Sequence, residues 1–307
     1  MKDKCNRTIK HIRFSITSEC SYNCIYCDKE GFIPQTSLLS VDEINKLCEL
    51  LATILSVTKI KLTGGEPLCR KEIVQIIKNI YNMNLYKDIS LTTNGYLLAQ
   101  KAQQLRDAGL NRVNVSLCSL NPRVYEKITG SNSLERVLEG LNAAREAGLE
   151  PIKLNFVLLK GLNDNELEDM IEFSSRTGYI LQLIELHKRA DAIGLELANY
   201  EKYHVDAKPI IDDLRSRAVK TLVRGEMQNR KVFTLPNNAV IETINNTPEA
   251  CKGCSKLRVG CDGNLFGCLF RSDLGKNMKK ALNTQYTLSQ YEEIIKQVVY
   301  SREPYYR

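Results

Sequence analysis

The chain has 307 residues, 43% of them apolar, which is enough for one large α/β domain or for a domain with a compact extension. Its 43 basic and 36 acidic residues leave a formal net charge of +7, a surplus too small to indicate nucleic-acid binding by itself. Residues 1–10 are charged rather than apolar, and no run approaches the ~18 apolar residues of a membrane span. We therefore expect a cytoplasmic protein with neither a membrane nor a nucleic acid as partner.

Six strand-like segments alternate with helix-like segments between residue 12 and about residue 187. The predicted strands are 12–17, 59–63, 89–93, 112–117, 152–159 and 180–186. The predicted helices are 41–55, 70–82, 97–108, 133–147 and 164–177, the last of them starting at Asn163. Ser40 and Glu43 form a capping box at the first helix, and glycine ends three others.

Repeated strand–helix units favour a parallel sheet with right-handed crossovers, either as a partial TIM-like barrel or as an open doubly wound sheet. In both folds the working residues lie at the carboxyl ends of strands. Beyond about residue 190 the rhythm stops, and only 231–235 and 239–243 look strand-like. We place a boundary near 190–215 and divide the chain into a core, 1–190, and a C-terminal part, 191–307.

Cysteine is the unusual component of the composition, with eleven residues. Four stand apart, and we interpret them as small buried or half-buried side chains: Cys5, Cys48, Cys69 and Cys118. The other seven form two groups, Cys20, Cys24 and Cys27 near the start of the chain and Cys251, Cys254, Cys261 and Cys268 near its end. Because disulfides are rare in the cytosol, such clusters indicate bound metal.

The first cysteine group directly follows the first predicted strand with the spacing C-x3-C-x2-C. Three thiolates can hold three irons of a [4Fe–4S] cluster and leave the fourth iron open to a small molecule. A zinc site would want four ligands. His11 lies on the far side of the strand and Asp28 is too near in sequence, so an open cluster is favoured over zinc.

This loop, with the aromatic Tyr26 between its last two cysteines, resembles the signature of the radical S-adenosylmethionine (SAM) superfamily. A second match is Thr63-Gly64-Gly65-Glu66-Pro67 at the end of the second strand. The resemblance implies a partial (βα)6 TIM-like barrel, SAM on the open iron, and SAM contacts from Tyr26, Gly65, Glu66, Ser116 and His187.

The second cysteine group could by itself be a zinc ribbon with Cys261 as the fourth ligand. Its C-x2-C, the basic residues after it, and the following D-G-x-L and C-L-F resemble the GTP 3′,8-cyclase family of molybdenum cofactor biosynthesis, with a match from Arg13 to Phe270. That resemblance implies a C-terminal extension with a second [4Fe–4S] cluster, held by Cys251, Cys254 and Cys268, whose open iron faces guanine.

The same family resemblance implies a GTP site formed by Arg13, Lys61, Thr92, Lys153, Lys256 and Arg258. A triphosphate needs several converging cations, because each supplies a charge-assisted hydrogen bond. Any single one could be a solvated surface charge. Arg13, Lys61 and Lys153, however, interrupt otherwise apolar strands, where a charge is costly unless a site uses it.

The reaction that the family implies starts with an electron from an external donor and cleavage of SAM to a 5′-deoxyadenosyl radical. The radical takes the 3′ hydrogen of GTP, and the ribose C3′ then bonds to guanine C8. The product passes to a separate pterin-forming enzyme. The resemblance also implies a homodimer.

Several residues depart from the family pattern, which usually has arginine at Lys256 and Gln182 and methionine at His187. Cys261 is an additional thiol, and Glu303-Pro-Tyr-Tyr-Arg307 replaces a Gly-Gly tail, as in an archaeal-type branch. Three alternatives stay open: a radical SAM peptide maturase, a cyclase of a different nucleotide, and a non-catalytic iron–sulfur or zinc scaffold.

Overall fold

The computed structural model describes residues 1–27, 38–188, 194–245, 247–284 and 286–305. All six predicted strands are confirmed, with β1 at His11–Ser15, β2 at Lys59–Thr63, β3 at Asp88–Thr93, β4 at Arg112–Ser116, β5 at Lys153–Leu158 and β6 at Ile180–Glu185. The five predicted helices are also present, as α1 Val41–Leu55, α2 Ile73–Asn82, α3 Leu98–Asp107, α5 Leu134–Glu146 and α6 Leu167–Thr177.

Two helix boundaries in this part were wrong. The chain first forms a short 3-10 turn at Pro67–Cys69, so α2 begins three residues later than predicted. Asn163 does not start α6. Its side chain accepts a hydrogen bond from the Leu159 amide (2.7 Å) and donates to the Cys118 carbonyl (2.7 Å), which stabilises the loop before the helix.

The residues after 190 contain more regular structure than the sequence analysis found. The strands are β7 Lys220–Arg224, β8 Arg230–Thr234, β9 Val240–Ile244, β10 Lys256–Val259, β11 Asn264–Phe266 and β12 Lys276–Asn277. The helices are α7 Gly194–Tyr203, α8 Lys208–Arg217, α9 Pro248–Lys252, α10 Lys279–Leu282 and α11 Leu288–Tyr300, and in the core part α4 Pro122–Thr129 was also missed.

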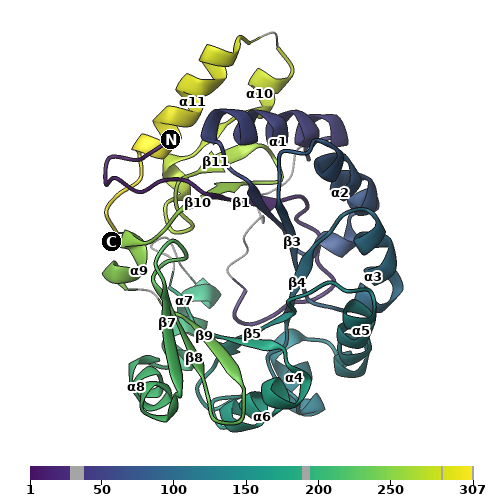
Figure 1. The fold of residues 1–307 in the computed structure, drawn as a ribbon, viewed down its shortest axis with the longest axis vertical. Helices are drawn as coiled ribbons and strands as arrows, with labels where there is room; N and C mark the ends of the chain where they lie inside the picture. Colours follow the sequence, from purple (N-terminus) through teal and green to yellow (C-terminus); the bar gives the residue numbers. More distant parts are fainter. Residues whose placement is uncertain (28–37, 189–193, 246, 285, 306–307) are drawn as a thin grey trace.

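All twelve of these strands belong to one sheet, in the order β12-β11-β10-β1-β2-β3-β4-β5-β6-β9-β8-β7. The neighbouring strands are parallel from β10 through β1–β6 to β9. They are antiparallel at both ends of the sheet, where β10 pairs with β11 and β9 pairs with β8. The strands curve into a wall, and α1, α2, α3, α5 and α6 lie on its outer side (Figure 1). Strands from beyond residue 190 extend this wall at both ends, and the division at residue 190 stays a prediction.

The two ends of the curved sheet approach each other. Met227, in the turn between β7 and β8, forms an isolated antiparallel bridge with Cys254, just before β10. The Gln228 amide also donates a hydrogen bond to the Gly253 carbonyl (2.9 Å). This contact narrows the open side of the barrel and brings the β7–β8 hairpin to the second cysteine group.

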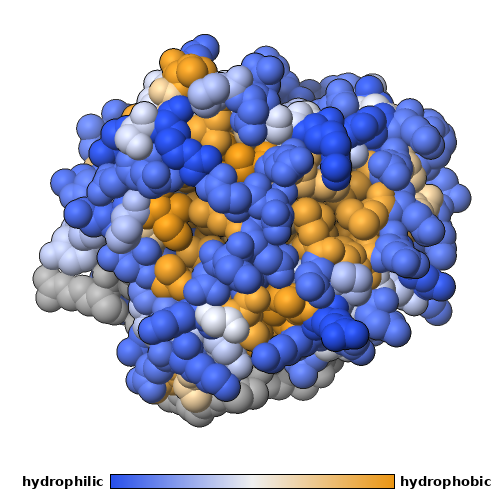
Figure 2. Space-filling model, turned by 90° about the horizontal axis from the view of Figure 1, so that it is seen from below, coloured by the Kyte–Doolittle hydropathy of each residue, from blue (hydrophilic) through white to orange (hydrophobic). Residues whose placement is uncertain are grey.

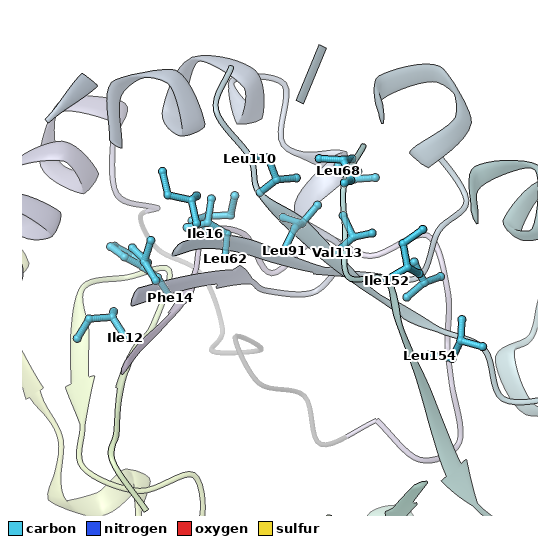
Figure 3. Close-up of a cluster of buried hydrophobic side chains, with 14 of the residues drawn as sticks. Ile12, Phe14, Ile16, Leu62, Leu68, Leu91, Leu110, Val113, Ile152 and Leu154 are labelled. Atoms are coloured by element: carbon cyan, nitrogen blue, oxygen red, sulfur yellow. The ribbon is translucent and has the colours of Figure 1, made fainter. Parts of the chain in front are cut away.

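Residues alternate between the two faces of the strands, as the two-residue period of a strand requires. The outward residues are apolar and pack against the helices, and Figure 3 shows Ile12, Phe14, Leu62, Leu91, Val113 and Leu154 in that layer. Between them, most inward residues are polar or charged, and the exceptions include Val157, Ile180 and Ile184. The core therefore lies outside the barrel wall, and the inside is left for a polar site.

The outer surface has a different composition from the helix–sheet layer. On the face shown in Figure 2, hydrophilic residues form most of the raised surface, and apolar residues show mainly in recesses between them. Among the residues that the structure describes, no helix is both long and apolar enough to cross a lipid bilayer.

Candidate active site

A cavity of about 560 Å³ lies on the inner side of the barrel wall. Its volume is in the range that suits a small-molecule substrate. Every residue that the sequence analysis assigned to a site lines it: Arg13, Cys20, Cys24, Tyr26, Cys27, Lys61, Gly65, Glu66, Thr92, Ser116, Lys153, His187, Cys251, Cys254, Lys256, Arg258 and Cys268. The fold therefore brings both cysteine groups and the basic residues to one space.

The first cysteine loop packs directly against the glycine turn after β2. The Gly65 amide donates to the Thr17 carbonyl (2.9 Å), and the Glu66 amide donates to the Glu19 carbonyl (2.7 Å). A Cβ atom built on Gly65 would lie 2.3 Å from the Glu19 carbonyl oxygen, a distance that no real side chain tolerates. Glycine is therefore required at this position because two backbones meet there.

Glu66 is fully buried and ties the turn to the end of β3. One carboxylate oxygen accepts from the Leu68 amide (3.0 Å) and the Thr93 hydroxyl (2.7 Å), and the other accepts from the Asn94 amide (2.6 Å). Burial raises the pKa of Glu66 to about 7, although these three donors oppose the shift. The structure thus gives Glu66 a positioning role that the sequence did not reveal.

His187 and Thr92 each carry a buried polar atom that lacks a hydrogen-bond partner within the described part of the chain, Nδ1 and Oγ1 respectively. The His187 ring meets Phe270 edge to face, with 6.0 Å between the ring centroids. Burial, aided by Lys256 and Arg258, lowers the pKa of His187 to about 3, so the ring is neutral. Unsatisfied buried groups that face a cavity are suited to a ligand.

The described wall of the cavity carries twelve lysine and arginine residues and four carboxylates. The register places Arg258, Arg13 and Lys61 side by side on β10, β1 and β2. Burial lowers the pKa of Lys61 and of Lys256 well below the ordinary value, and neighbouring cations lower both further. These basic residues lie within the strands, so the expectation that working residues sit at strand carboxyl ends does not hold for them. It does hold for the first cysteine loop after β1, for Ser116 at the end of β4 and for His187 after β6.

The sequence analysis missed a largely buried polar network within this wall. Glu242 on β9 accepts hydrogen bonds from Lys153 (2.5 Å), Gln182 (2.5 Å) and Arg224 (2.8 Å). Gln182 in turn accepts from Asn114 (2.6 Å), whose own oxygen accepts from Lys61 (2.7 Å). Glu242 is an isolated acidic residue in an apolar strand, which is a signal of the kind already used for Lys61 and Lys153.

The second cysteine group is held by arginines from the two ends of the chain. Arg302, just after α11, donates to the Cys254 carbonyl (2.6 Å) and the Gly267 carbonyl (3.1 Å), and it pairs with buried Asp3 (2.9 Å). Arg7 donates to the Cys251 carbonyl (3.0 Å). Burial raises the pKa of the Cys254 thiol, but Arg302 and Lys256 outweigh it and hold that pKa below its ordinary value.

Cys261 is not placed with the other three cysteines of its group. Cys261 follows β10, whereas Cys251 and Cys254 precede that strand. Because a strand rises ~3.3 Å per residue, the length of β10 separates Cys261 from those two cysteines. Its side chain is buried, does not line the cavity, and its carbonyl accepts from the Leu39 amide (2.8 Å).

Comparison with known proteins identifies two family regions. Residues 14–174 match the Radical SAM superfamily, and residues 179–307 match the Molybdenum Cofactor Synthesis C family. A relative from Methanothermobacter thermautotrophicus, named probable GTP 3′,8-cyclase, is 40% identical in an alignment of 312 positions that covers 100% of this chain and 99% of the relative. The chain belongs to the GTP 3′,8-cyclase family of radical SAM enzymes. A relative of the same name from Thermococcus kodakarensis is also 40% identical, over 99% of both chains.

The fold comparison is broader. SuiB from Streptococcus suis, solved with S-adenosylmethionine, has a TM-score of 0.68 at 13% identity and covers 96% of this chain and 68% of its own. This likeness shows the radical SAM fold alone. Family membership implies SAM and a [4Fe–4S] cluster, and the three thiols on a loop braced by Gly64 and Gly65 fit that cluster.

Proposed function

We propose that this protein is a GTP 3′,8-cyclase, which joins the ribose C3′ of GTP to guanine C8 in the first step of molybdenum cofactor biosynthesis. The observation that carries this proposal is that cysteines from both groups line one cavity together with a set of basic residues. A peptide maturase would have no need of that wall. An external electron donor, a pterin-forming enzyme that takes the product, and a homodimer are part of the proposal.

Cys20, Cys24 and Cys27 would hold the first cluster, which with bound SAM supplies a 5′-deoxyadenosyl radical that takes hydrogen from the substrate. The backbone of the glycine turn packs directly against this loop, and Glu66 keeps the turn fixed against the end of β3. Tyr26, Gly65, Ser116 and the neutral His187 would line the SAM side of the cavity.

The basic residues would bind the triphosphate. Arg13, Lys61 and Lys153 come from three different strands, and Lys256 and Arg258 from a fourth, so their charges converge on one region without sharing one loop. A triphosphate would offset their mutual repulsion and the cost of their burial. The Thr92 hydroxyl, which has no hydrogen-bond partner among the described residues, would add a neutral contact.

Cys251, Cys254 and Cys268 would hold a second [4Fe–4S] cluster and thereby position the guanine. Arg302 donates to the carbonyls of both Cys254 and Gly267, and so it holds the segment with Cys254 next to the segment that leads to Cys268. The buried position of Cys261 beyond the other end of β10 leaves three thiolates for that cluster, and so one iron would remain for the base.

The test is to reconstitute the protein anaerobically with iron and sulfide, add SAM, GTP and dithionite, and measure 5′-deoxyadenosine and cyclised nucleotide. We expect 5′-deoxyadenosine to rise with GTP. Cys24→Ala should abolish SAM cleavage, whereas Cys254→Ala should abolish the cyclised nucleotide. SAM cleavage that ignores GTP, with the nucleotide recovered unchanged, would refute the assigned substrate and leave only the radical SAM core.

A further inference from the structure

Arg230 is a buried cation that none of the preceding assignments uses. It starts β8 and is 9% exposed, with its side chain lining the cavity. The antiparallel register pairs Arg230 with Arg224 on β7, and it pairs Val232, two residues further on, with Glu242 on β9. Because alternate residues share a face, Arg230 lies on the same inner face as Glu242.

The contacts of Arg230 leave much of its hydrogen-bonding capacity unused. Its Nη1 is 3.6 Å from the Glu242 carboxylate, beyond hydrogen-bond distance, and its Nη2 donates weakly to Gln228 (3.4 Å). Within the described part of the chain its Nε has no hydrogen-bond partner. A buried guanidinium with an unused donor is unfavourable, so this geometry is suited to a ligand that accepts from it.

Neutralising Glu242 does not require Arg230. One oxygen of that carboxylate already accepts from Lys153 and Gln182, and the other accepts from Arg224. Glu242 is also absent from the cavity surface, whereas Arg230 and Lys153 lie on it. The network therefore has more positive charge than its single carboxylate balances, and the excess faces the cavity.

The neighbours of Arg230 are also cationic. Lys256 lies close to Arg230, because Lys256 Nζ and Arg230 Nη2 both donate to the side-chain oxygen of Gln228. Arg230 also contributes to the lowered pKa of Lys61. Repulsion of this kind is relieved by an anion carrying several charges, and a nucleotide polyphosphate has that property.

We propose that Arg230 is a phosphate-binding residue for the nucleotide substrate, so that the hairpin β7–β8 supplies a cation to the site in addition to those on β1, β2, β5 and β10. This inference rests on the proposed function. It assigns to Arg230 recognition of the phosphate chain and no contact with the base.

The test measures binding of GTP, GMP and guanosine to the reconstituted protein by equilibrium dialysis, without reductant. Loss of one charge-assisted hydrogen bond predicts that Arg230→Met weakens GTP binding by about 10- to 100-fold. Guanosine binding should change by less than about twofold, because that ligand carries no phosphate. Lys231→Met, a charge loss on the neighbouring residue outside the cavity wall, should bind GTP as the wild type does.

Arg230→Lys keeps the positive charge but lacks the planar guanidinium with its paired N–H donors. This variant provides the test if Arg230→Met does not fold. It should lower the preference for GTP over guanosine several-fold. The inference is overturned if the wild type binds GTP and neither variant changes that preference, an outcome that leaves the proposed function intact. If the wild type binds no GTP, the proposed function and the inference both fail.

Discussion

The two cysteine sites are built by different means. The first is a short loop directly after β1, fixed by backbone hydrogen bonds to a glycine turn that follows the adjacent strand. The second joins segments before β10 and after β11, and it is held by Arg302 and Arg7 from opposite ends of the chain. The first site therefore depends on neighbouring strands, and the second depends on contacts between residues far apart in sequence.

The two sites should therefore differ in how well they tolerate amino-acid substitutions in the residues around them. Backbone and glycine contacts tolerate few changes, because any Cβ at Gly65 would collide with the loop. Side-chain contacts from distant arginines can be altered one at a time. We expect the second site to be the more sensitive to substitutions outside its own cysteines.

The largest expected effect is a difference in iron content between variants of Cys268 and Cys261, because only Cys268 is proposed as a cluster ligand. In anaerobically reconstituted protein, Cys268→Ala should lower the iron content from about eight to about four per chain, because one four-iron cluster is lost. Cys261→Ala should leave the iron content unchanged, since the structure places this thiol away from the cavity. Loss of about four irons from Cys261→Ala would mean that this thiol is a ligand.

The next effect tests the arginine that holds the second site. Arg302→Met removes two hydrogen bonds to backbone carbonyls and an ion pair with Asp3. Asp3 still has an ion pair with Arg7, at 2.7 Å, in the variant. We expect a loss of about 2–3 kcal/mol in the free energy of unfolding, measured by denaturant titration.

A matched control for Arg302 is Arg217→Met, which removes an exposed arginine from its pairs with Glu168 and Asp213. Its free energy of unfolding should fall by less than about 1 kcal/mol, because exposed ion pairs contribute little. Equal losses for the two variants would show that Arg302 has no special structural role.

The smallest effect concerns pH and His187. Burial, with Lys256 and Arg258, lowers the pKa of this side chain to about 3 from the 6.5 of the free side chain. The folded state therefore keeps His187 neutral, whereas in the unfolded state the same side chain takes up a proton below about pH 6.5. Protonation of the unfolded state lowers the free energy of unfolding of the protein as pH falls below that value.

His187→Met should remove that contribution. The stability of the variant relative to the wild type should rise by about 1 kcal/mol for each pH unit between 6 and 4, as measured by unfolding at each pH. His11, whose pKa burial lowers to about 4, responds with the same sign and is present in both proteins, so it cancels in the difference. Parallel stability curves for the two proteins would contradict the burial-driven shift.

The sequence by itself determined the six strands of the core and their connecting helices, because local periodicity and capping carry those features. It also showed that seven of the cysteines fall into two groups, for which cluster ligation stays a prediction. It also indicated that Arg13, Lys61 and Lys153 belong to a site, since charged residues alternate there with apolar ones. Those residues do line the cavity, on the inner face of the barrel wall.

Only the tertiary structure decided how the residues after 190 complete the site. β9 and β10 pair with opposite ends of the core sheet, an arrangement for which no local pattern exists. The same pairing brings Glu242 to Lys153, leaves Arg230 facing the cavity and buries Cys261 away from its group. These contacts join residues far apart in the chain, and so they depend on packing and charge in three dimensions rather than on any local pattern.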